Sequence, residues 1–150
     1  MVAGLSGFLL DTNVISELMK RRPSRGVVAW IDRTPESLLY LSVITIGEVR
    51  KGIDLLSDDD PKRAALQSWL DSDLRLRFAG RLLAIDDAVA ERWGQLEAVA
   101  KKRRVTLPTI DALLAATALH HGLTLVTRNT ADIGPTGVPV VNPWRHPTGS

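Results

Sequence analysis

The chain alternates between short apolar runs and longer stretches in which apolar residues recur three and four positions apart. Short runs bounded by turn-forming residues are typical of buried strands, and the three-and-four spacing is typical of helices. The runs predict strands at residues 8–10, 38–43, 82–85, 123–126 and 138–141. The spacing predicts helices at 14–20, 24–32, 45–56, 61–78, 87–102 and 109–121, and leaves a loop at 127–135.

Residues at the ends of the helical stretches support these boundaries. Pro61 follows an acid, which is a good start for a helix, and Gly80 stops the same helix. Asp86 is placed to cap the next helix. Gly122 follows the last one, where a left-handed residue commonly ends a helix. The 109–121 stretch is apolar nearly all round, so we expect it to be buried on both sides.

Strands separated by helices indicate βα units, and right-handed crossovers between parallel strands place helices on both faces of a sheet. The predicted fold is therefore α/β, a three-layer α/β/α sandwich around a central, mostly parallel five-stranded sheet. The chain shows no internal repeat and no linker. We expect one domain over residues 1–142 and a tail over 143–150 that lies on its surface.

Composition narrows the class of protein. The 150 residues contain 45% hydrophobic and 24% charged residues, as in ordinary soluble domains. The absence of cysteine excludes a disulfide framework and fits a reducing, cytoplasmic setting. The N-terminus has no basic segment, and its apolar run stops at Asp11, so neither a signal peptide nor a membrane span is expected. The net charge of +2 does not by itself indicate a nucleic-acid partner.

Polar residues follow the predicted strands where parallel strands share an edge. Asp11 follows the first strand, Glu48 lies in the first turn after the second, and Asn129 and Asp132 follow the fourth. In open α/β sheets this edge is where ligands bind. Asp111 opens the buried helix and joins the group only if that helix begins beside the same edge, which periodicity cannot show.

Each of these residues also has a structural explanation. Asp11 can cap a helix, and Asp111 gains from the dipole of its own helix. Thr45-Ile46-Gly47-Glu48 matches the capping box S/T-x-x-E. Asn129 and Asp132 can form Asx turns. Considered singly, each explanation is adequate; the joint placement at one edge favours a site.

Carboxylates gathered in one place repel by roughly 4 kcal/mol per close pair at an effective dielectric near 20. A fold that keeps them together usually supplies a cation. Hard oxygen ligands without histidine or cysteine favour Mg²⁺ or Mn²⁺ over zinc. Such ions activate water and stabilise the charge that develops on a phosphoryl group.

Four segments resemble the signature blocks of PIN-domain ribonucleases, in particular VapC toxins of type II toxin–antitoxin systems, and Asn142-Pro143-Trp144 resembles the FitB-like branch. The segments are FLLDTNVISE (8–17), LSVITIGEVRKG (41–52), LPTIDALLAATA (107–118) and LVTRNTAD (125–132). The resemblance spans nearly the whole chain. It implies a metal-dependent endoribonuclease in which Mg²⁺-activated water hydrolyses an RNA phosphodiester bond and a VapB-type antitoxin neutralises the toxin.

By the same resemblance, Asp11, Glu48 and Asp111 match the acids of the family, with Asp11 and Asp111 as the direct Mg²⁺ ligands. Asn129 stands where the family has Asp or Asn, and Asp132 matches an acid found in many members. Three further residues, Thr12, Thr127 and Arg128, are candidates for positioning water, an ion or a phosphate.

The resemblance also implies partners. The first two helices and the 61–78 helix would form a groove for the C-terminal segment of an antitoxin, and family members commonly form homodimers. Basic residues cluster at 20–25, 75–81 and 101–104. These clusters are compatible with contacts to an RNA backbone, but a run of charges is more often a solvated helix face.

Two other functions compete with this one. A haloacid-dehalogenase-like phosphatase would use Asp11 as nucleophile, but it normally has a second acid where Asn13 stands. The second alternative, from another class, is a flavodoxin-like receiver or an inactive PIN-like interaction module. A receiver, however, normally has a lysine after a late strand, where this chain has Arg128 and Asn129.

Overall fold

A parallel five-stranded sheet forms the centre of the molecule. The computed structural model describes residues 6–145. The strands are β1 (Phe8–Leu10), β2 (Leu39–Ser42), β3 (Leu82–Leu83), β4 (Thr124–Val126) and β5 (Val140–Val141). They lie in the order β3-β2-β1-β4-β5, and every pairing is parallel. The predicted α/β sandwich is therefore confirmed, and its acidic edge begins directly after β1.

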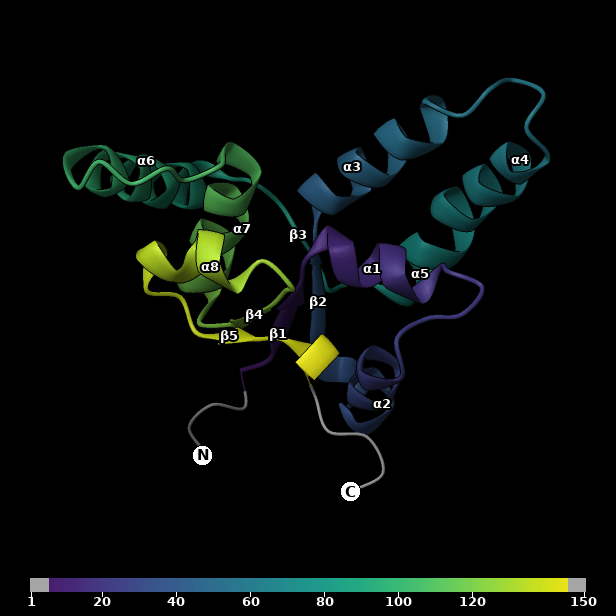
Figure 1. Cartoon of the computed structure of the whole chain (residues 1–150), viewed down its shortest axis with the longest axis horizontal. Coiled ribbons are helices and arrows are strands. Elements are labelled where there is room, and N and C mark those ends of the chain that lie inside the picture. Colours follow the sequence, from purple (N-terminus) through teal and green to yellow (C-terminus); the bar gives the residue numbers. More distant parts are fainter. Residues whose placement is uncertain (1–5, 146–150) are drawn as a thin grey trace.

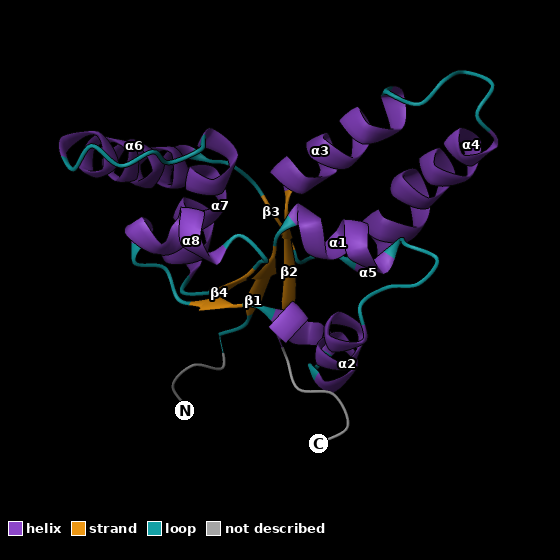
Figure 2. Ribbon diagram, in the orientation of Figure 1, coloured by secondary structure: helices purple, strands orange, loops and turns teal. Residues whose placement is uncertain are grey.

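Helices cover both faces of the sheet, as Figures 1 and 2 show. On one side lie α1 (Thr12–Leu18), α2 (Arg25–Arg33), α3 (Val43–Asp54), α4 (Pro61–Ser68) and α5 (Arg75–Arg77). On the other lie α6 (Asp87–Lys102), α7 (Thr109–His121) and α8 (Thr130–Ile133). Short turns of helix complete the chain: η1 (Glu36–Leu38), η3 (Gly134–Thr136) and η4 (Pro143–Arg145).

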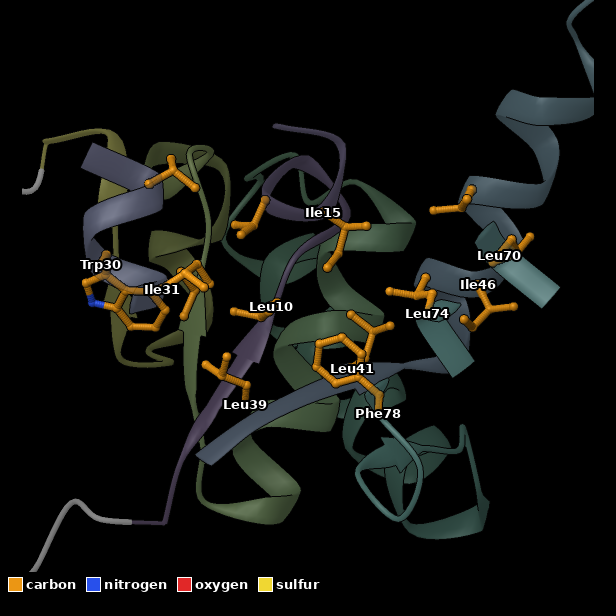
Figure 3. Close-up of a cluster of buried hydrophobic side chains, with 14 of the residues drawn as sticks. Leu10, Ile15, Trp30, Ile31, Leu39, Leu41, Ile46, Leu70, Leu74 and Phe78 are labelled. Atoms are coloured by element: carbon orange, nitrogen blue, oxygen red, sulfur yellow. The ribbon is translucent and has the colours of Figure 1, made fainter. Parts of the chain in front are cut away.

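Two apolar clusters hold the three layers together, one on each face of the sheet. Alternation along β1 sends Leu10 into the larger cluster and Leu9 into the other. Figure 3 shows side chains of the larger cluster converging from β1, β2 and the helices on that face. Helix α7 contacts the sheet and α6 at once, and its Leu114, Ala115 and Ala118 are fully buried. This confirms that the helix is covered on both sides.

Side-chain caps fix several helix boundaries where the sequence places them. The Asp86 carboxylate accepts a hydrogen bond from the amide of Val89 at 3.0 Å, and the Asp60 carboxylate accepts one from that of Lys62 at 2.9 Å. Gly122 has a φ of 67°, in the left-handed region that favours glycine. These local interactions explain why the chain turns back toward the sheet at the predicted places.

The start of α3 differs from the prediction. The helix begins at Val43, and the Ser42 hydroxyl caps it by accepting a hydrogen bond from the amide of Ile44 at 3.0 Å. Thr45 lies inside the helix with its side chain fully buried. The capping-box interpretation of Thr45 and Glu48 is therefore wrong, because Ser42 takes the capping position and frees both residues for other contacts.

Four further segments depart from the predicted pattern. The 61–78 stretch is not a uniform helix: a π-helical segment, η2 (Trp69–Leu74), separates α4 from α5. The predicted 127–135 loop contains α8 and part of η3, which are too short to give a periodic signal. Strands β3 and β5 contain only two residues each, because the apolar runs extend beyond the hydrogen-bonded ladders.

The C-terminal end of the described chain packs against the domain. Pro143 is buried, and Trp144 packs against the larger apolar cluster. The rest of the predicted tail, 146–150, and the first five residues, where no signal peptide is expected, lie outside the described residues. The domain boundary at 142 stays a prediction. Within residues 6–145, no helix has the length and apolar character needed to cross a membrane.

Candidate active site

A cavity of about 420 Å³ opens where β1, β2 and β4 end. Asp11 follows β1, Glu48 comes from α3 after β2, and Asp111 comes from the first turn of α7. All three line the cavity, so the structure brings these acids together, and their roles in the site stay predictions. The remaining lining residues are Thr12, Asn13, Ser16, Glu17, Lys20, Ile110, Arg128, Asn129 and Trp144.

Asp11 is held from two sides at the base of the cavity. Its carboxylate accepts hydrogen bonds from the Thr12 amide at 2.6 Å and from the Thr127 hydroxyl at 2.7 Å. Asp11 therefore caps α1 and also lines the site. Burial raises the pKa of this carboxyl, the two hydrogen bonds lower it, and the charge of Glu48 raises it; the net direction is upward.

Glu48 is positioned by hydroxyl groups. The Thr12 hydroxyl donates to the Glu48 carboxylate and lies 3.0 Å from the Thr45 hydroxyl. Thr12 thus joins α1 to α3, and it contacts two of the three acids through its amide and its hydroxyl. The residues of the supposed capping box are part of the site's own hydrogen-bond network.

Asp111 is the acid whose ionisation the fold opposes most clearly. It is only 9% exposed. Burial, followed by the charges of Asp11, Asp132 and Glu48, raises its pKa to about 6. Among residues 6–145, no donor forms a hydrogen bond with its carboxylate. Helix α7 therefore begins beside the acidic edge, which periodicity alone could not establish.

Asn129 and Asp132 occupy different positions relative to the cavity. Asn129 lines it, and its amide donates to the Thr127 hydroxyl at 3.0 Å. Its side chain makes no capping bond to α8. Asp132 is exposed on α8 outside the lining, although its charge raises the pKa of Asp111.

The donor set suits a hard divalent cation. In residues 6–145, no three acidic or histidine side chains are already arranged as ligands around one point. The acids are nevertheless close enough that the charge of Glu48 raises the pKa of Asp11 and of Asp111, and no cation of the described chain pairs with them. The Asn13 Oδ1 atom, beside them, is buried without a hydrogen-bond partner. A bound Mg²⁺ or Mn²⁺ would relieve both the crowding and this unsatisfied oxygen.

Comparison with known proteins identifies the family. The model of the PIN domain family matches residues 8–131, which include Asp11, Glu48 and Asp111. This chain belongs to the PIN-domain family.

Relatives narrow the group within this family. The PIN domain is 40% identical to the toxin FitB of Neisseria gonorrhoeae over 91% of this chain and 97% of that protein. It is 38% identical to the VapC ribonuclease Y4jK of Sinorhizobium fredii over 91% of this chain and 96% of that protein. It is thus a VapC-type, FitB-like PIN domain.

Solved structures agree with this assignment. The crystal structure of FitAcB from Neisseria gonorrhoeae superimposes with a TM-score of 0.87 at 40% identity, covering 92% of this chain and 99% of that one. A toxin–antitoxin complex from Klebsiella pneumoniae gives a TM-score of 0.64 at 28% identity, and the match covers 91% of this chain and 98% of that one.

Some residues at the PIN-domain site were not predicted from the sequence. Lys20, which follows α1, lines the cavity. So do Asn13, Ser16 and Glu17, which come from α1 itself. Their spacing of three and four positions places them on one polar face of that helix, which is the signal that could have identified them. Trp144 lines the cavity from η4, and only its resemblance to the FitB-like branch pointed to it.

A second cavity, of about 460 Å³, lies between α1 and the α4–η2–α5 arm of the PIN domain. Its walls are largely apolar. The lining residues are Ile15, Leu18, Met19, Ala65, Leu66, Trp69, Asp73, Leu74 and Arg77. This is the region in which the sequence predicted a groove for an antitoxin segment, although α2, the second predicted helix, does not contribute to the lining.

Proposed function

We propose that this PIN domain is an endoribonuclease toxin that hydrolyses RNA phosphodiester bonds with a divalent metal ion and is neutralised by an antitoxin. The observation that supports this most strongly is the convergence of Asp11, Glu48 and Asp111 on one cavity from three distant segments. The relatives are a toxin and a ribonuclease by name, and they match nearly the full length of the chain.

Asp11 and Asp111 are proposed as the direct ligands of Mg²⁺ or Mn²⁺, with Glu48 as the third acid. Either Asn129, which lines the cavity, or Asp132, which lies outside the lining and acts on Asp111 through its charge, would supply the fourth ligand position. The bound ion supplies an activated water and a positive charge that stabilises the phosphoryl group. Hydrogen bonds already hold the carboxylates of Asp11 and Glu48 without an ion, so these two acids would be oriented in advance.

The neighbouring hydroxyls hold the acids rather than the substrate. Thr127 is fully buried and donates to Asp11, so its hydroxyl orients a carboxylate. Thr12 does the same for Glu48. Arg128 lines the same cavity and is exposed, which suits a contact with an RNA phosphate.

Removal of divalent ions tests the metal dependence directly. We expect purified protein to cut a mixed single-stranded RNA in Mg²⁺ or Mn²⁺, to lose this cleavage in EDTA, and to regain it when the ion is restored. Fragment ends resolved on a sequencing gel give the measurement. Cleavage that survives EDTA would contradict metal-dependent hydrolysis, and a folded protein without any cleavage would favour the inactive interaction module.

The apolar cavity is proposed as the binding site of the antitoxin. Ala65 is exposed and lines it, whereas Ala64, its neighbour on α4, is exposed and does not. We expect Ala65→Arg to weaken binding of the antitoxin by at least about 10-fold, because the arginine fills the groove, and to leave RNA cleavage by the free protein intact. Titration calorimetry with the antitoxin measures the change. Ala64→Arg is the matched control, and equal binding by both variants would place the antitoxin elsewhere.

Two further parts of the proposal concern assembly and location. A homodimer is proposed by resemblance to the family, and sedimentation of the purified protein tests it. A cytoplasmic setting stays a prediction from the absence of cysteine in the sequence.

A further inference from the structure

Arg128 lies in the acidic cavity, yet its guanidinium does not pair with the acids there. It lines the same space as Asp11, Glu48 and Asp111, yet among residues 6–145 it forms no ion pair. Its guanidinium carbon instead lies 5.2 Å from the centre of the Trp144 ring. A guanidinium stacked on an aromatic face keeps its N–H donors free along its edge.

Trp144 is itself held in place by packing and by hydrogen bonding. It packs against the larger apolar cluster, and its backbone amide donates to the Asn142 side chain at 3.0 Å. Its indole side chain lies close enough to Glu17 to lower the pKa of that carboxyl. The ring is therefore fixed both by packing and by a polar contact, so the guanidinium above it has a defined position.

Glu17 is a buried acid that the proposed cleavage does not use. Its side chain comes from α1 and is only 8% exposed. It accepts the Ser24 amide at 2.8 Å, and the Lys20 ammonium lies 2.9 Å from its other oxygen. The hydrogen bond from Lys20 is the main reason that its pKa lies below the usual range. Glu17 thus remains charged and connects Lys20 and Trp144.

We infer that Glu17 and Trp144 are positioning residues that hold Arg128 at the cavity as a binding group for an RNA backbone phosphate. Trp144 keeps the guanidinium off the carboxylates, and Glu17 fixes Trp144. Without the stack, Arg128 would be free to pair with Asp11 or Asp111 and compete with the cation for them. The inference rests on the proposed ribonuclease function and deepens it.

Binding of a fluorescein-labelled single-stranded RNA in EDTA, over a series of salt concentrations, tests the inference without cleavage. We expect Arg128→Ala to weaken binding by about 10-fold or more, as for a charge-assisted hydrogen bond, and to reduce the salt slope by about 0.7, the value for one phosphate contact on a single strand. Arg128→Lys keeps the charge but loses the planar stack, so it should recover only part of the affinity.

The positioning role is tested by combining substitutions. Trp144→Leu should weaken binding in the wild-type background and have no further effect when Arg128 is already alanine. Trp144→Phe keeps an aromatic face but lacks the N–H that reaches Glu17, so an intermediate loss is expected. Glu17→Ala should likewise add nothing to Arg128→Ala. Thermal melts establish that each variant is folded.

Arg92, exposed on α6 and outside the cavity, supplies the matched control: Arg92→Ala should leave the salt slope unchanged. Additive losses would show that Trp144 or Glu17 acts independently of Arg128 and would overturn the positioning role. An unchanged slope in Arg128→Ala, with normal cleavage by the wild type, would overturn this inference but not the proposed function. A wild-type protein that neither binds nor cuts RNA would overturn both.

Discussion

Asp11→Asn is expected to lower the rate of RNA cleavage by at least about 10³-fold. The carboxylate is the acid held most rigidly at the site, by the Thr12 amide and the Thr127 hydroxyl, and asparagine keeps its shape but removes the charge. A metal ion contributes several kcal/mol to the stabilisation of a phosphoryl transition state, which corresponds to a loss of this size. Initial rates with excess labelled RNA provide the measurement.

The same variant should lose the thermal stabilisation that Mg²⁺ or Mn²⁺ gives to the wild type, while its metal-free form is no less stable. Burial already raises the pKa of Asp11, so removing the charge relieves a cost in the absence of metal. Glu91→Gln, an exposed substitution on α6 away from the cavity, is the control and should keep the full metal response. Equal metal shifts in wild type and Asp11→Asn would contradict the assignment of Asp11 as a ligand.

Asp111→Asn is expected to stabilise the metal-free protein at neutral pH even though it abolishes cleavage. The pKa of Asp111 rises from its ordinary value of 3.8 to about 6, so the folded state opposes its ionisation. At about 1.4 kcal/mol per pKa unit, the cost at pH 7.5 is up to about 3 kcal/mol. In a chain of this length that corresponds to a rise of about 5–10 °C in Tm. Melting in EDTA measures it.

The stability advantage of Asp111→Asn should grow as the pH rises. Between about pH 4 and 6 the folded state holds a proton on Asp111 that the unfolded chain has lost, so this group destabilises the fold increasingly as pH rises. The advantage of Asp111→Asn should therefore be absent near pH 4 and complete above pH 6. A difference in Tm that does not vary with pH would mean that the substitution acts through packing and not through charge.

The sequence predicts the fold well wherever a local signal and tertiary packing agree. Asp86 and Gly122 mark helix ends that the structure confirms. At α3 two capping signals compete, and the structure uses Ser42 and not Thr45 because burial of Thr45 brings its hydroxyl to Thr12. Local pattern could not decide this, since the partner is 33 residues away.

The site was predictable only in part for a related reason. Acids after parallel strands share an edge by geometry, which is how Asp11 and Glu48 could be grouped. Asp111 reaches the site only if α7 has the right position and rotation. Because α7 is apolar on all sides, its hydrophobic periodicity does not encode this orientation. Glu17 went unnoticed because an acid in a short helix is usually solvated, whereas here it is buried and interacts with Trp144 near the other end of the chain.

The pairing of β1 with β4 determines when the protein can become active during its synthesis. Asp11 meets Thr127 across 116 positions, and Trp144 comes later still. Contacts so distant in sequence form only after most of the polypeptide has been made. A nascent or C-terminally shortened chain would carry Asp11 and Glu48 without the hydroxyl that orients Asp11 or the ring beneath Arg128. A chain whose synthesis ends before these last codons would thus have an incomplete site.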